Sequence, residues 1–423
     1  MAGLVQLEAT GLQDKYFTDD PEYTYFIKNF KRHTNYSKSF IDIDPSGDVD
    51  FGQIARFTIP PNIGDLIKTI SVKMTLPAIS SGICYVESIG HALIERVDLL
   101  IGGEVIQSIP SDYLQIYSEQ NVTQTKQWAL NNMIGKYPNK RAAGVRNSNY
   151  SIISSLGSAT SDRKCFVDIP FYFFNNTELS LPLCAITKQE VEVEIKLRDL
   201  SDLLVDTSGF LVTTPINKSI KDFKLNCEIV FLDNEERNMI RNRKIDYTIT
   251  QIQQNIFSIP LGTNQFKCKT SFINPVKEMY FIIQRENKKT ASDFVYPFDY
   301  DNLSFSQNNK MILYEQLKHL TLHLNTEEVI NETTGNYIFL KAVQSTIHHS
   351  RCQLMRRFYS YSFALEPEKH YPTGQLNFSL VKDQIINLSL NESAIHSREF
   401  RVCALSYNIL RVSEGFAKTI FNS

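Results

Sequence analysis

The chain has 423 residues and a mass of 48.6 kDa, which is long enough for two or three domains with sizeable hydrophobic cores. It carries 44 Lys and Arg against 46 Asp and Glu, and this formal net charge of −2 argues against a strongly basic, phosphate-binding surface. Hydrophobic residues at 42% and charged residues at 21% exclude wholesale disorder, and no apolar run reaches the ~18 residues of a membrane-spanning helix.

The residue types favour strands and an intracellular product. There are 27 Phe and 20 Tyr but only one Trp, and aromatic residues together with Val, Ile and Thr are typical of β-sheets. Residues 1–6 show no basic flank before an apolar core, so we expect no secretory signal. The 7 Cys include no C-x-x-C spacing, and we interpret them as reduced, mostly buried thiols. In this Asn-rich chain, chance explains the Asn-x-Ser/Thr triplets at Asn35, Asn121, Asn331 and Asn377.

The N-terminal part of the chain reads as an arm followed by short strands. Residues 1–25 show no stable hydrophobic period, and short strands separated by turn residues begin at about Phe26. Ile67 to Leu76 alternates, and Pro77 ends the alternation. His91 to Ile109 contains two alternating runs separated by Gly102-Gly103, which predicts a tight hairpin turn with positive φ.

Further strands and two long polar segments follow. Phe166 to Phe174 is a dense apolar run and predicts a strand buried on both faces, whereas Glu190 to Leu197 alternates between apolar and charged residues. Tyr113 to Ile134 has a helical start. Lys136 to Arg163 is rich in Asn, Ser, Gly and basic residues, and Lys196 to Asp222 contains a second excursion. We expect these two segments to be exposed loops on the functional surface.

The second half of the chain repeats the first. IERVDLLIGGEVI at Ile94–Ile106 is similar to LKHLTLHLNTEEVI at Leu317–Ile330, and LCAITKQEVEVEI at Leu183–Ile195 is similar to FSLVKDQIINLSL at Phe378–Leu390. The pieces occur in the same order in both halves, which predicts a duplicated β-sandwich. The charged stretch Asp233–Asp246 suits a linker between the two units.

One segment resembles a calcium-binding loop. Oxygen-bearing side chains alternate from Asp42 to Asp50, with Gly47 at the sharp turn. The closing position, however, is Gln53 instead of a bidentate Glu, Pro45 lies within the loop, and neither flank reads as an amphipathic helix. We therefore expect an acidic turn between strands that does not require calcium.

The histidines do not form a zinc motif. His319 and His323 would lie on one face of a strand, and His348-His349 follow later. Zinc needs three or four converging ligands, and no Cys or carboxylate spacing completes such a set. We expect exposed or hydrogen-bonded histidines, and no metal or other cofactor.

The sequence contains no enzyme motif that we recognise. There is no G-x-S-x-G, no phosphate-binding G-x-x-x-x-G-K-[ST] and no G-x-G-x-x-G after a strand. The paired acids Glu235-Glu236 fall in the expected linker. The basic clusters Arg241–Lys244 and Arg356-Arg357 are short and offset by nearby acids, so direct nucleic-acid binding is not expected. We predict no catalytic, cofactor-binding or metal-binding residues.

Several segments that are spread over nearly the whole chain carry a joint pattern. They are Gly3–Asp14 followed by Pro21, Phe26–Asn35, Gly47–Gly52, Asp65–Pro77, His91–Gly103, Val167–Phe174, Leu181–Leu183, Val230–Arg237, Asn274–Glu278, Pro372–Gly374, Asn377–Ser379 and Tyr407–Arg411. Together these segments resemble the double jelly-roll major capsid proteins of the large nucleocytoplasmic DNA viruses.

The resemblance implies an all-β fold of two tandem eight-stranded jelly rolls with short helices in the loops. We expect an N-terminal arm (1–25), a first roll (26–240), a second roll (241–412) and a C-terminal tail (413–423). The resemblance further implies a homotrimeric, pseudo-hexagonal capsomer that tiles an icosahedral virion shell and is assembled in the host cytoplasm. Expected partners are neighbouring capsomers, minor capsid and penton proteins, and inner-membrane proteins of the virion.

Two other functions remain open from the sequence. A scaffold or minor shell protein of the same fold would have similar patterns. A carbohydrate-binding or hydrolytic β-sandwich would need a cleft with paired acids or exposed aromatics, and Trp128 is the only Trp available as a platform.

Overall fold

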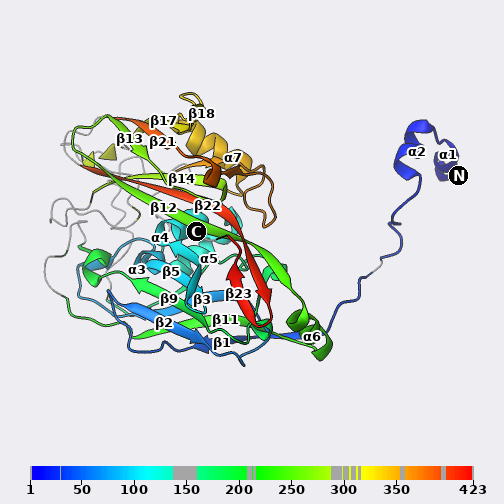
Figure 1. Ribbon diagram of the computed structural model, residues 1–423, viewed down its shortest axis with the longest axis horizontal. Coiled ribbons are helices and arrows are strands. Elements are labelled where there is room, and N and C mark those ends of the chain that lie inside the picture. Colours follow the sequence, from blue (N-terminus) through cyan, green and yellow to red (C-terminus); the bar gives the residue numbers. More distant parts are fainter. Residues whose placement is uncertain are drawn as a thin grey trace. The chain divides into compact units, whose positions relative to one another are not determined.

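Figure 1 shows the computed structural model, in which strands predominate. The structure describes residues 2–28, 30–136, 160–206, 212, 216–286, 298, 304–305, 311–312, 316–352, 358–391 and 397–421. The expected surface loop Lys136–Arg163 lies mostly outside the described residues, as do Arg356-Arg357 and part of the second excursion. Within the described part of the chain, no helix is both long and apolar enough to cross a bilayer.

The first roll, which we define as strands β1 to β11, is built from two main sheets. One has the strand order β1-β11-β3-β7, with β8 added to β3, and the other has the order β2-β9-β5-β6, while β10 pairs with β4. The strands are β1 (Tyr36–Ile43), β2 (Ile54–Ile59), β3 (Leu66–Leu76), β4 (Ile83–Tyr85), β5 (Ile94–Ile101), β6 (Glu104–Pro110), β7 (Arg163–Asp168), β8 (Leu181–Pro182), β9 (Val191–Leu197), β10 (Leu204–Asp206) and β11 (Asp222–Leu232).

The second roll, strands β12 to β23, has the same plan. Its sheets have the orders β12-β22-β14-β19 and β13-β21-β17-β18, with β20 added to β14, β23 added to β22 and a separate β15-β16 pair. The strands are β12 (Ile245–Ile259), β13 (Gln265–Lys269), β14 (Pro275–Arg285), β15 (Ser304–Phe305), β16 (Met311–Ile312), β17 (Leu317–Leu324), β18 (Glu327–Ile330), β19 (Phe358–Ser362), β20 (Leu376–Asn377), β21 (Gln384–Leu390), β22 (Arg398–Ser413) and β23 (Phe416–Thr419).

The two rolls correspond strand by strand. Eight strands of the first roll, taken in chain order, correspond to eight strands of the second. The sheet β1-β11-β3-β7 corresponds to β12-β22-β14-β19, and the sheet β2-β9-β5-β6 corresponds to β13-β21-β17-β18. The repeated segments at Ile94–Ile106 and Leu317–Ile330 are the equivalent hairpins β5-β6 and β17-β18. The predicted double jelly roll is therefore confirmed.

The correspondence extends to single residues, because irregularities in strand pairing recur at matching places. The register of β3 with β11 skips Lys68, and the register of β14 with β22 skips Lys277. In both rolls a short strand, β8 or β20, pairs with the residues just before the skipped lysine. A β-bulge fixes the local register of a strand. Ser71 and Tyr280 each lie three residues after the skipped lysine, so they are counterparts. Ser71 pairs with β11 and β7, and Tyr280 pairs with the equivalent strands β22 and β19.

The helices lie in the connections between strands. They are α3 (Ile89–Leu93), α4 (Ser111–Gln120), α5 (Gln127–Ile134), α6 (Asn234–Asn242) and α7 (Gln344–His348), with short 3-10 turns η1 (Gln124–Lys126), η3 (Thr177–Leu179), η4 (Leu183–Ala185), η5 (Leu200–Leu203) and η7 (Phe378–Leu380) and the π-helical turn η6 (Phe339–Val343). Helices α4 and α5 fall in the segment with the predicted helical start.

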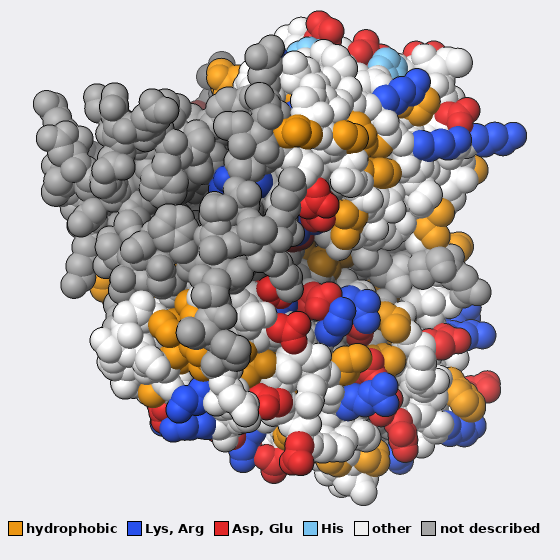
Figure 2. Space-filling model, turned by 90° about the vertical axis from the view of Figure 1, so that its left-hand side faces the viewer, with side chains coloured by type: hydrophobic (Ala, Val, Ile, Leu, Met, Phe, Trp, Pro, Cys, Tyr) orange, Lys and Arg blue, Asp and Glu red, His pale blue; other side chains and the backbone are white. Residues whose placement is uncertain are grey.

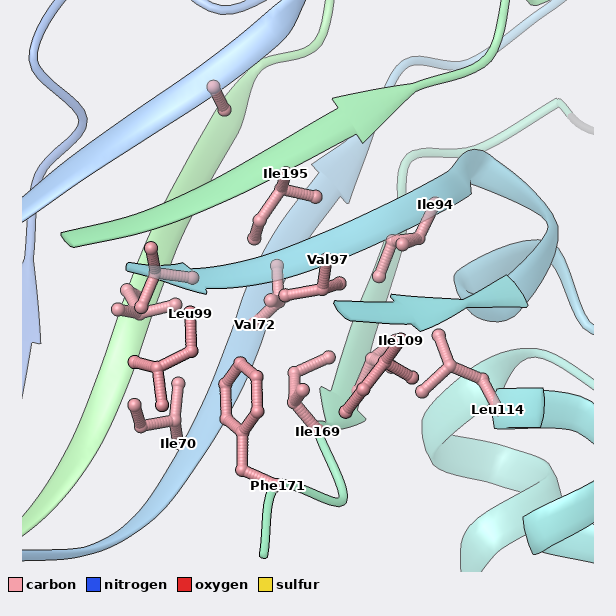
Figure 3. Close-up of a cluster of buried hydrophobic side chains, with 14 of the residues drawn as sticks. Ile70, Val72, Ile94, Val97, Leu99, Ile109, Leu114, Ile169, Phe171 and Ile195 are labelled. Carbon is pink, nitrogen blue, oxygen red and sulfur yellow. The ribbon is translucent and has the colours of Figure 1, made fainter. Parts of the chain in front are cut away.

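Apolar side chains from both sheets of the first roll meet in one core (Figure 3). Ile70 and Val72 of β3 face Val97 and Leu99 of β5, and Leu114 of α4 closes one end. The second roll has its own core, which includes Phe281, Phe378 and Phe400. Several second-roll side chains instead belong to the first core, and they are Ile249, Tyr280, Ile282, Phe358, Cys403, Leu405, Leu410, Val412 and Ala417. The boundary between the rolls is therefore packed like a protein interior.

One predicted strand was wrong, and the expected linker between the rolls is mostly helical. The apolar run from Phe166 is a strand only as far as Asp168, because Pro170 has no N–H to donate to a sheet and the chain turns there, although its side chains stay buried. The stretch Asp233–Asp246 is mostly the helix α6, whose N-terminus is capped by the Asp233 side chain and carries Glu235 and Glu236 in its first turn.

Both end segments of the chain contain regular elements. Met1–Tyr36 forms a unit separate from Ser37–Ser423, and it contains the helices α1 (Ala2–Glu8) and α2 (Leu12–Thr18). Residues 413–423 contain β23, which pairs with β22 through the register Leu410 to Thr419.

Candidate functional site

The contact between the two rolls is the most elaborate site in the described residues, and α4 is at its centre. The helix starts directly after strand β6, and Pro110 holds the extended backbone that precedes it. Most α4 side chains are buried, although a helix on the surface of a single roll would expose one face. The second roll therefore covers the side of α4 that the first roll leaves open.

Aromatic and polar contacts join α4 to the outer face of the sheet β12-β22-β14-β19. The rings of Tyr113 and Tyr280 lie 6.2 Å apart between centroids. Next to them, Asp112 lies 3.3 Å from Arg401 and accepts a hydrogen bond of 3.3 Å from Gln254. These contacts fix where the helix lies across the sheet.

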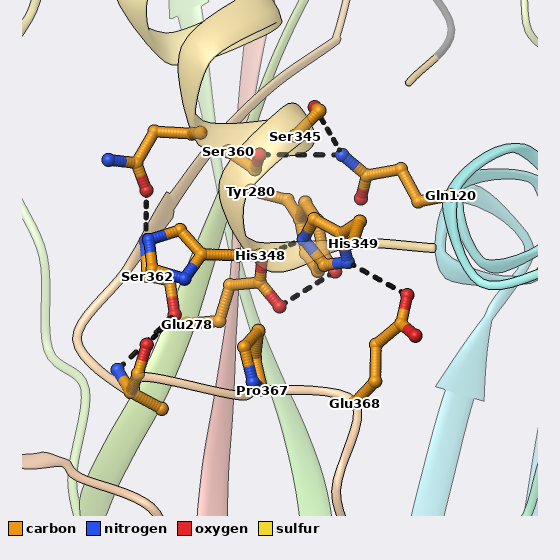
Figure 4. A network of polar contacts seen from close by, with 12 residues as sticks. Gln120, Glu278, Tyr280, Ser345, His348, His349, Ser360, Ser362, Pro367 and Glu368 are labelled. Carbon is orange, nitrogen blue, oxygen red and sulfur yellow. Dashed lines mark hydrogen bonds and ion pairs between the residues drawn. The ribbon is translucent and has the colours of Figure 1, made fainter. Parts of the chain in front are cut away.

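A buried ionic cluster in the second roll adjoins this contact (Figure 4). The His349 Nε2 atom lies 2.6 Å from Glu278 Oε1, its Nδ1 atom lies 3.3 Å from Glu368 Oε1, and Tyr280 donates a 2.9 Å hydrogen bond to Glu278. Burial alone would lower the pKa of His349, but the two carboxylates outweigh burial and raise the pKa to about 10. The imidazolium is therefore the charged partner of two acids at neutral pH.

Lys277 adds a second buried cation. Its ammonium donates a 2.8 Å hydrogen bond to the Pro367 carbonyl and lies 5.4 Å from the centre of the Tyr407 ring. Burial lowers the pKa of Lys277 to about 8, against the opposing effect of Glu278 and Glu368.

A second polar cluster crosses directly from one roll to the other. The fully buried Glu119 of α4 lies 3.0 Å from Arg351 of the second roll and also pairs with Lys136. Gln120 donates hydrogen bonds of 2.9 and 3.4 Å to Ser345 and Ser360. Leaving such buried groups without partners would cost free energy, so the clusters favour one relative position of the rolls.

The sequence did not identify this contact, although one signal was available. The charged residues Lys277 and Glu278 lie in strand β14, whose residues are nearly all buried. A carboxylate in such a strand needs a buried partner. The partner, His349, is 71 residues away along the chain, so the sequence does not show which residue it is.

The acidic segment from Asp42 joins β1 to β2, as expected for a turn between strands. Asp42 accepts hydrogen bonds of 2.7 and 2.9 Å from Lys73 and one of 2.6 Å from Asn226, while Asp44 lies 3.0 Å from Lys224. The lysine contacts and the Asn226 hydrogen bond lower the pKa of Asp42. These carboxylates are thus engaged by amino groups and an amide.

The candidate histidines are dispersed. His319 and His323 lie on β17, where His323 is 3.2 Å from the Thr321 hydroxyl and 3.9 Å from Glu328. His348 lies 3.1 Å from the Leu365 carbonyl. Among the residues that the structure describes, no group of three or more His, Cys, Asp or Glu is arranged to hold a metal ion.

The other candidates lie on helices and on the surface. Glu235, Glu236 and Arg241 belong to α6, and Trp128 is 66% exposed on α5. In the view of Figure 2, acidic and basic side chains are interspersed over the lower part of the molecule, which is the first roll in Figure 1. Over this part of the face, the side chains that the structure describes form no patch of a single sign of the kind that nucleic-acid-binding surfaces have.

Comparisons with known proteins agree with this architecture. A family model described as "Major capsid protein N-terminus" matches residues 24–233, and one described as "Large eukaryotic DNA virus major capsid protein" matches residues 236–418. The chain is 28% identical to the major capsid protein of Pyramimonas orientalis virus and 25% identical to that of Phaeocystis pouchetii virus, in each case over 100% of this chain and 99% of the relative.

A solved structure shows the same fold. The capsid protein in the quasi-atomic model of the PBCV-1 virus capsid superposes with a TM-score of 0.76 at 19% identity, over 95% of this chain and 100% of that one. The two family models together span nearly the whole sequence and meet close to α6, between the two rolls. The chain belongs to the major capsid proteins of large eukaryotic DNA viruses and is a structural capsid subunit.

Proposed function

We propose that three copies of this chain form a pseudo-hexagonal capsomer, and that these capsomers tile an icosahedral shell. The observation that carries the proposal is the same strand order present twice in one chain. Two similar lobes per copy become six lobes in a ring of three, and closed cyclic symmetry is the common arrangement of identical subunits. A near-sixfold outline suits packing in a hexagonal lattice.

The proposed lobes are residues 26–240 and 241–412, preceded by an arm (1–25) and followed by a tail (413–423). The internal correspondence of the sheets supports this division, and the pairing of β23 with β22 supports a tail that completes the second lobe. The role is structural and involves no catalysis. Its partners are neighbouring capsomers, minor and penton proteins, and membrane proteins inside the virion, with assembly in the host cytoplasm.

The mass of the purified protein in solution tests the trimer. Size-exclusion chromatography with light scattering, at near-neutral pH and moderate salt, should report about three times the chain mass of 48.6 kDa. A stable monomer or dimer over the accessible concentration range would contradict the proposal. Electron microscopy of purified particles, with this protein identified by mass, then distinguishes a major shell subunit from a scaffold that is absent from the mature particle.

A further inference from the structure

Each roll has a helical segment between its β6-type and β7-type strands. In the first roll this segment is α4 and α5, between β6 and β7, and in the second roll it is η6 and α7, between β18 and β19. Within one chain, α4 packs on the outer face of the second roll's sheet β12-β22-β14-β19. The corresponding pair of surfaces, the segment η6-α7 and the outer face of β1-β11-β3-β7, cannot meet in the same way within one chain.

The segment η6-α7 has apolar side chains in solvent. Ile347 is 66% exposed, and Ile338 at the start of the segment is 55% exposed. By contrast, Leu114 and Ile116 of α4 are buried. The difference arises because the second roll covers α4, whereas within the described residues Ile338 and Ile347 stay largely uncovered. The segment η6-α7 therefore lacks the covering sheet that α4 has.

The outer face of the β1-β11-β3-β7 sheet, which would supply this cover, differs in chemistry from its second-roll counterpart, and the edge strand β1 along it is mostly exposed. The second-roll side chains Tyr280, Ile282, Cys403 and Leu405 pack into the core of the first roll. The strand registers place Ser71, Lys73, Asn226 and Glu228 at the matching first-roll positions. Ion pairs cover this face, with Lys73 2.7 Å from Asp42 and Lys38 3.0 Å from Glu228. Between these two pairs on β1, the Phe40 ring is 62% exposed.

We propose that the segment η6-α7 of one copy packs on the outer face of the β1-β11-β3-β7 sheet of a second copy, in the way that α4 packs on the second roll within a chain. The inference rests on the proposed homotrimer and names the contact that would hold it together. The two free surfaces are the two halves of one contact already present inside the chain, which favours a second copy over an unrelated partner. Such head-to-tail contacts close into a ring when the rotation between lobes permits.

The polar character of the free face fits this role. The contact between rolls forms as the chain folds and can be as apolar as a core. A face that meets its partner only after folding must stay soluble beforehand, and non-obligate interfaces are about as apolar as the remaining protein surface. An interface of ion pairs with a few apolar residues, such as Phe40 and Ile347, has the polar and apolar composition of a non-obligate interface.

Substitutions on both halves test the contact. Ile347→Asp and Phe40→Asp each place a carboxylate in the proposed interface, and we expect trimer dissociation at protein concentrations at least about tenfold higher than for the wild type. The controls are Leu380→Asp, an exposed residue of η7 in the second roll, and Ile54→Asp, an exposed residue on the edge strand β2 of the other first-roll sheet. Both controls should remain trimers, and circular dichroism should show that all four variants fold.

Cross-linking of the wild type provides a test that does not depend on folding of variants. Trimers assembled from a mixture of ¹⁵N-labelled and unlabelled chains are treated with an amine-reactive cross-linker. Lys341 of η6 should link to Lys73 or Lys38 in peptide pairs of mixed isotope composition.

The outcomes separate this inference from the proposed trimer. If the wild type is a trimer but Ile347→Asp and Phe40→Asp dissociate no more readily than their controls, or if Lys341 links only to peptides of its own isotope composition, the proposed contact is wrong and the trimer stands. If the wild type is a monomer at every concentration, the trimer is wrong and the contact is wrong with it.

Discussion

At the residue scale, the fold controls the charge state of His349. It lies between Glu278 at 2.6 Å and Glu368 at 3.3 Å, and its side chain is 1% exposed. Its folded-state pKa of about 10 lies above the ordinary value of 6.5, so the protonated form stabilises the folded state. This contribution is complete below about pH 6.5 and is lost as the pH rises through 10.

We predict that His349→Gln lowers the free energy of unfolding by about 3 kcal/mol near pH 7, because Glu278 loses its cation while staying buried. The difference from the wild type should shrink between pH 7 and pH 10, as measured by urea denaturation at each pH. His348→Gln is the matched control, because the imidazole of this neighbour lies 3.1 Å from an uncharged group, the Leu365 carbonyl. A difference that is constant or grows with pH would show that the imidazolium is not the stabilising species.

A second residue-scale prediction concerns the β5-β6 turn. Gly102 and Gly103 have φ of 60° and 81°, and a Cβ atom on Gly102 would come within 2.5 Å of the Gln189 amide, whereas one on Gly103 meets nothing. Gln189 also accepts a 2.6 Å hydrogen bond from the Ala417 backbone N–H, so it cannot move freely. Gly103→Ala should cost about 1 kcal/mol from backbone strain alone, and Gly102→Ala about 1 kcal/mol more.

Chemical denaturation of the two glycine variants provides the measurement. Equal losses of stability would show that Gln189 yields without cost, and a larger loss for Gly103→Ala would contradict the structural argument. The second roll makes the equivalent turn with Asn325 at φ 56°, which is a residue that tolerates this conformation.

Of these two residue-scale features, the turn was predictable from the sequence and the buried ion pair was not. The Gly102-Gly103 turn was predictable because its cause is local: adjacent glycines between alternating runs permit positive φ. The pairing of Glu278 with His349 was not predictable, because any buried carboxylate could be satisfied by several distant cations. The choice depends on how the strands and the segment η6-α7 pack together.

At the element scale, strands with one solvent-exposed face were predictable from the sequence, and elements buried on both sides were not. Val191–Leu197 alternates between buried and half-buried residues and was recognised from that pattern. Strand β14 and helix α4 are covered on both sides, so their sequences carry no clear period. The segment of helix α6 was predicted as a linker because its sequence is charged, and in the structure it is a helix without buried residues that connects the two rolls.

We predict that α6 is attached to the first roll chiefly through Asp65. Arg237 donates hydrogen bonds of 2.6 and 2.9 Å to both oxygens of this buried carboxylate, and the Leu232 N–H donates a third of 2.8 Å. Burial opposes ionisation, but Arg237 and the backbone bond together lower the pKa of Asp65. Asp65→Asn should therefore cost about 2 kcal/mol at neutral pH.

The stability that Asp65 contributes should disappear as the pH falls through its lowered pKa, because the carboxylate is then protonated in both states. The pair of Asp246 and Arg411, whose side chains are both partly exposed, is the control, since Asp246→Asn should change the free energy of unfolding much less than Asp65→Asn does. Equal effects of the two substitutions, measured by denaturation, would mean that Asp65 does not anchor the helix.

At the scale of the whole molecule, the two rolls share a core, and we predict that they unfold together. Side chains of the second roll such as Tyr280 and Leu405 belong to the first hydrophobic cluster, so neither roll can open without exposing apolar surface of the other. Trp128, the only Trp, lies in the first roll and reports on it through fluorescence, whereas circular dichroism reports on both rolls. The two denaturation curves should coincide, and separate midpoints would contradict the shared core.

The central claim is that one chain supplies two of six similar lobes and that the contact between copies repeats the contact between rolls. Cryo-electron microscopy of the purified oligomer tests this most directly. We expect three copies that form a ring of six jelly rolls, with the segment η6-α7 of each copy lying on the β1-β11-β3-β7 sheet of the next copy. A different number of copies, or a trimer in which that sheet face remains exposed to solvent, would contradict it.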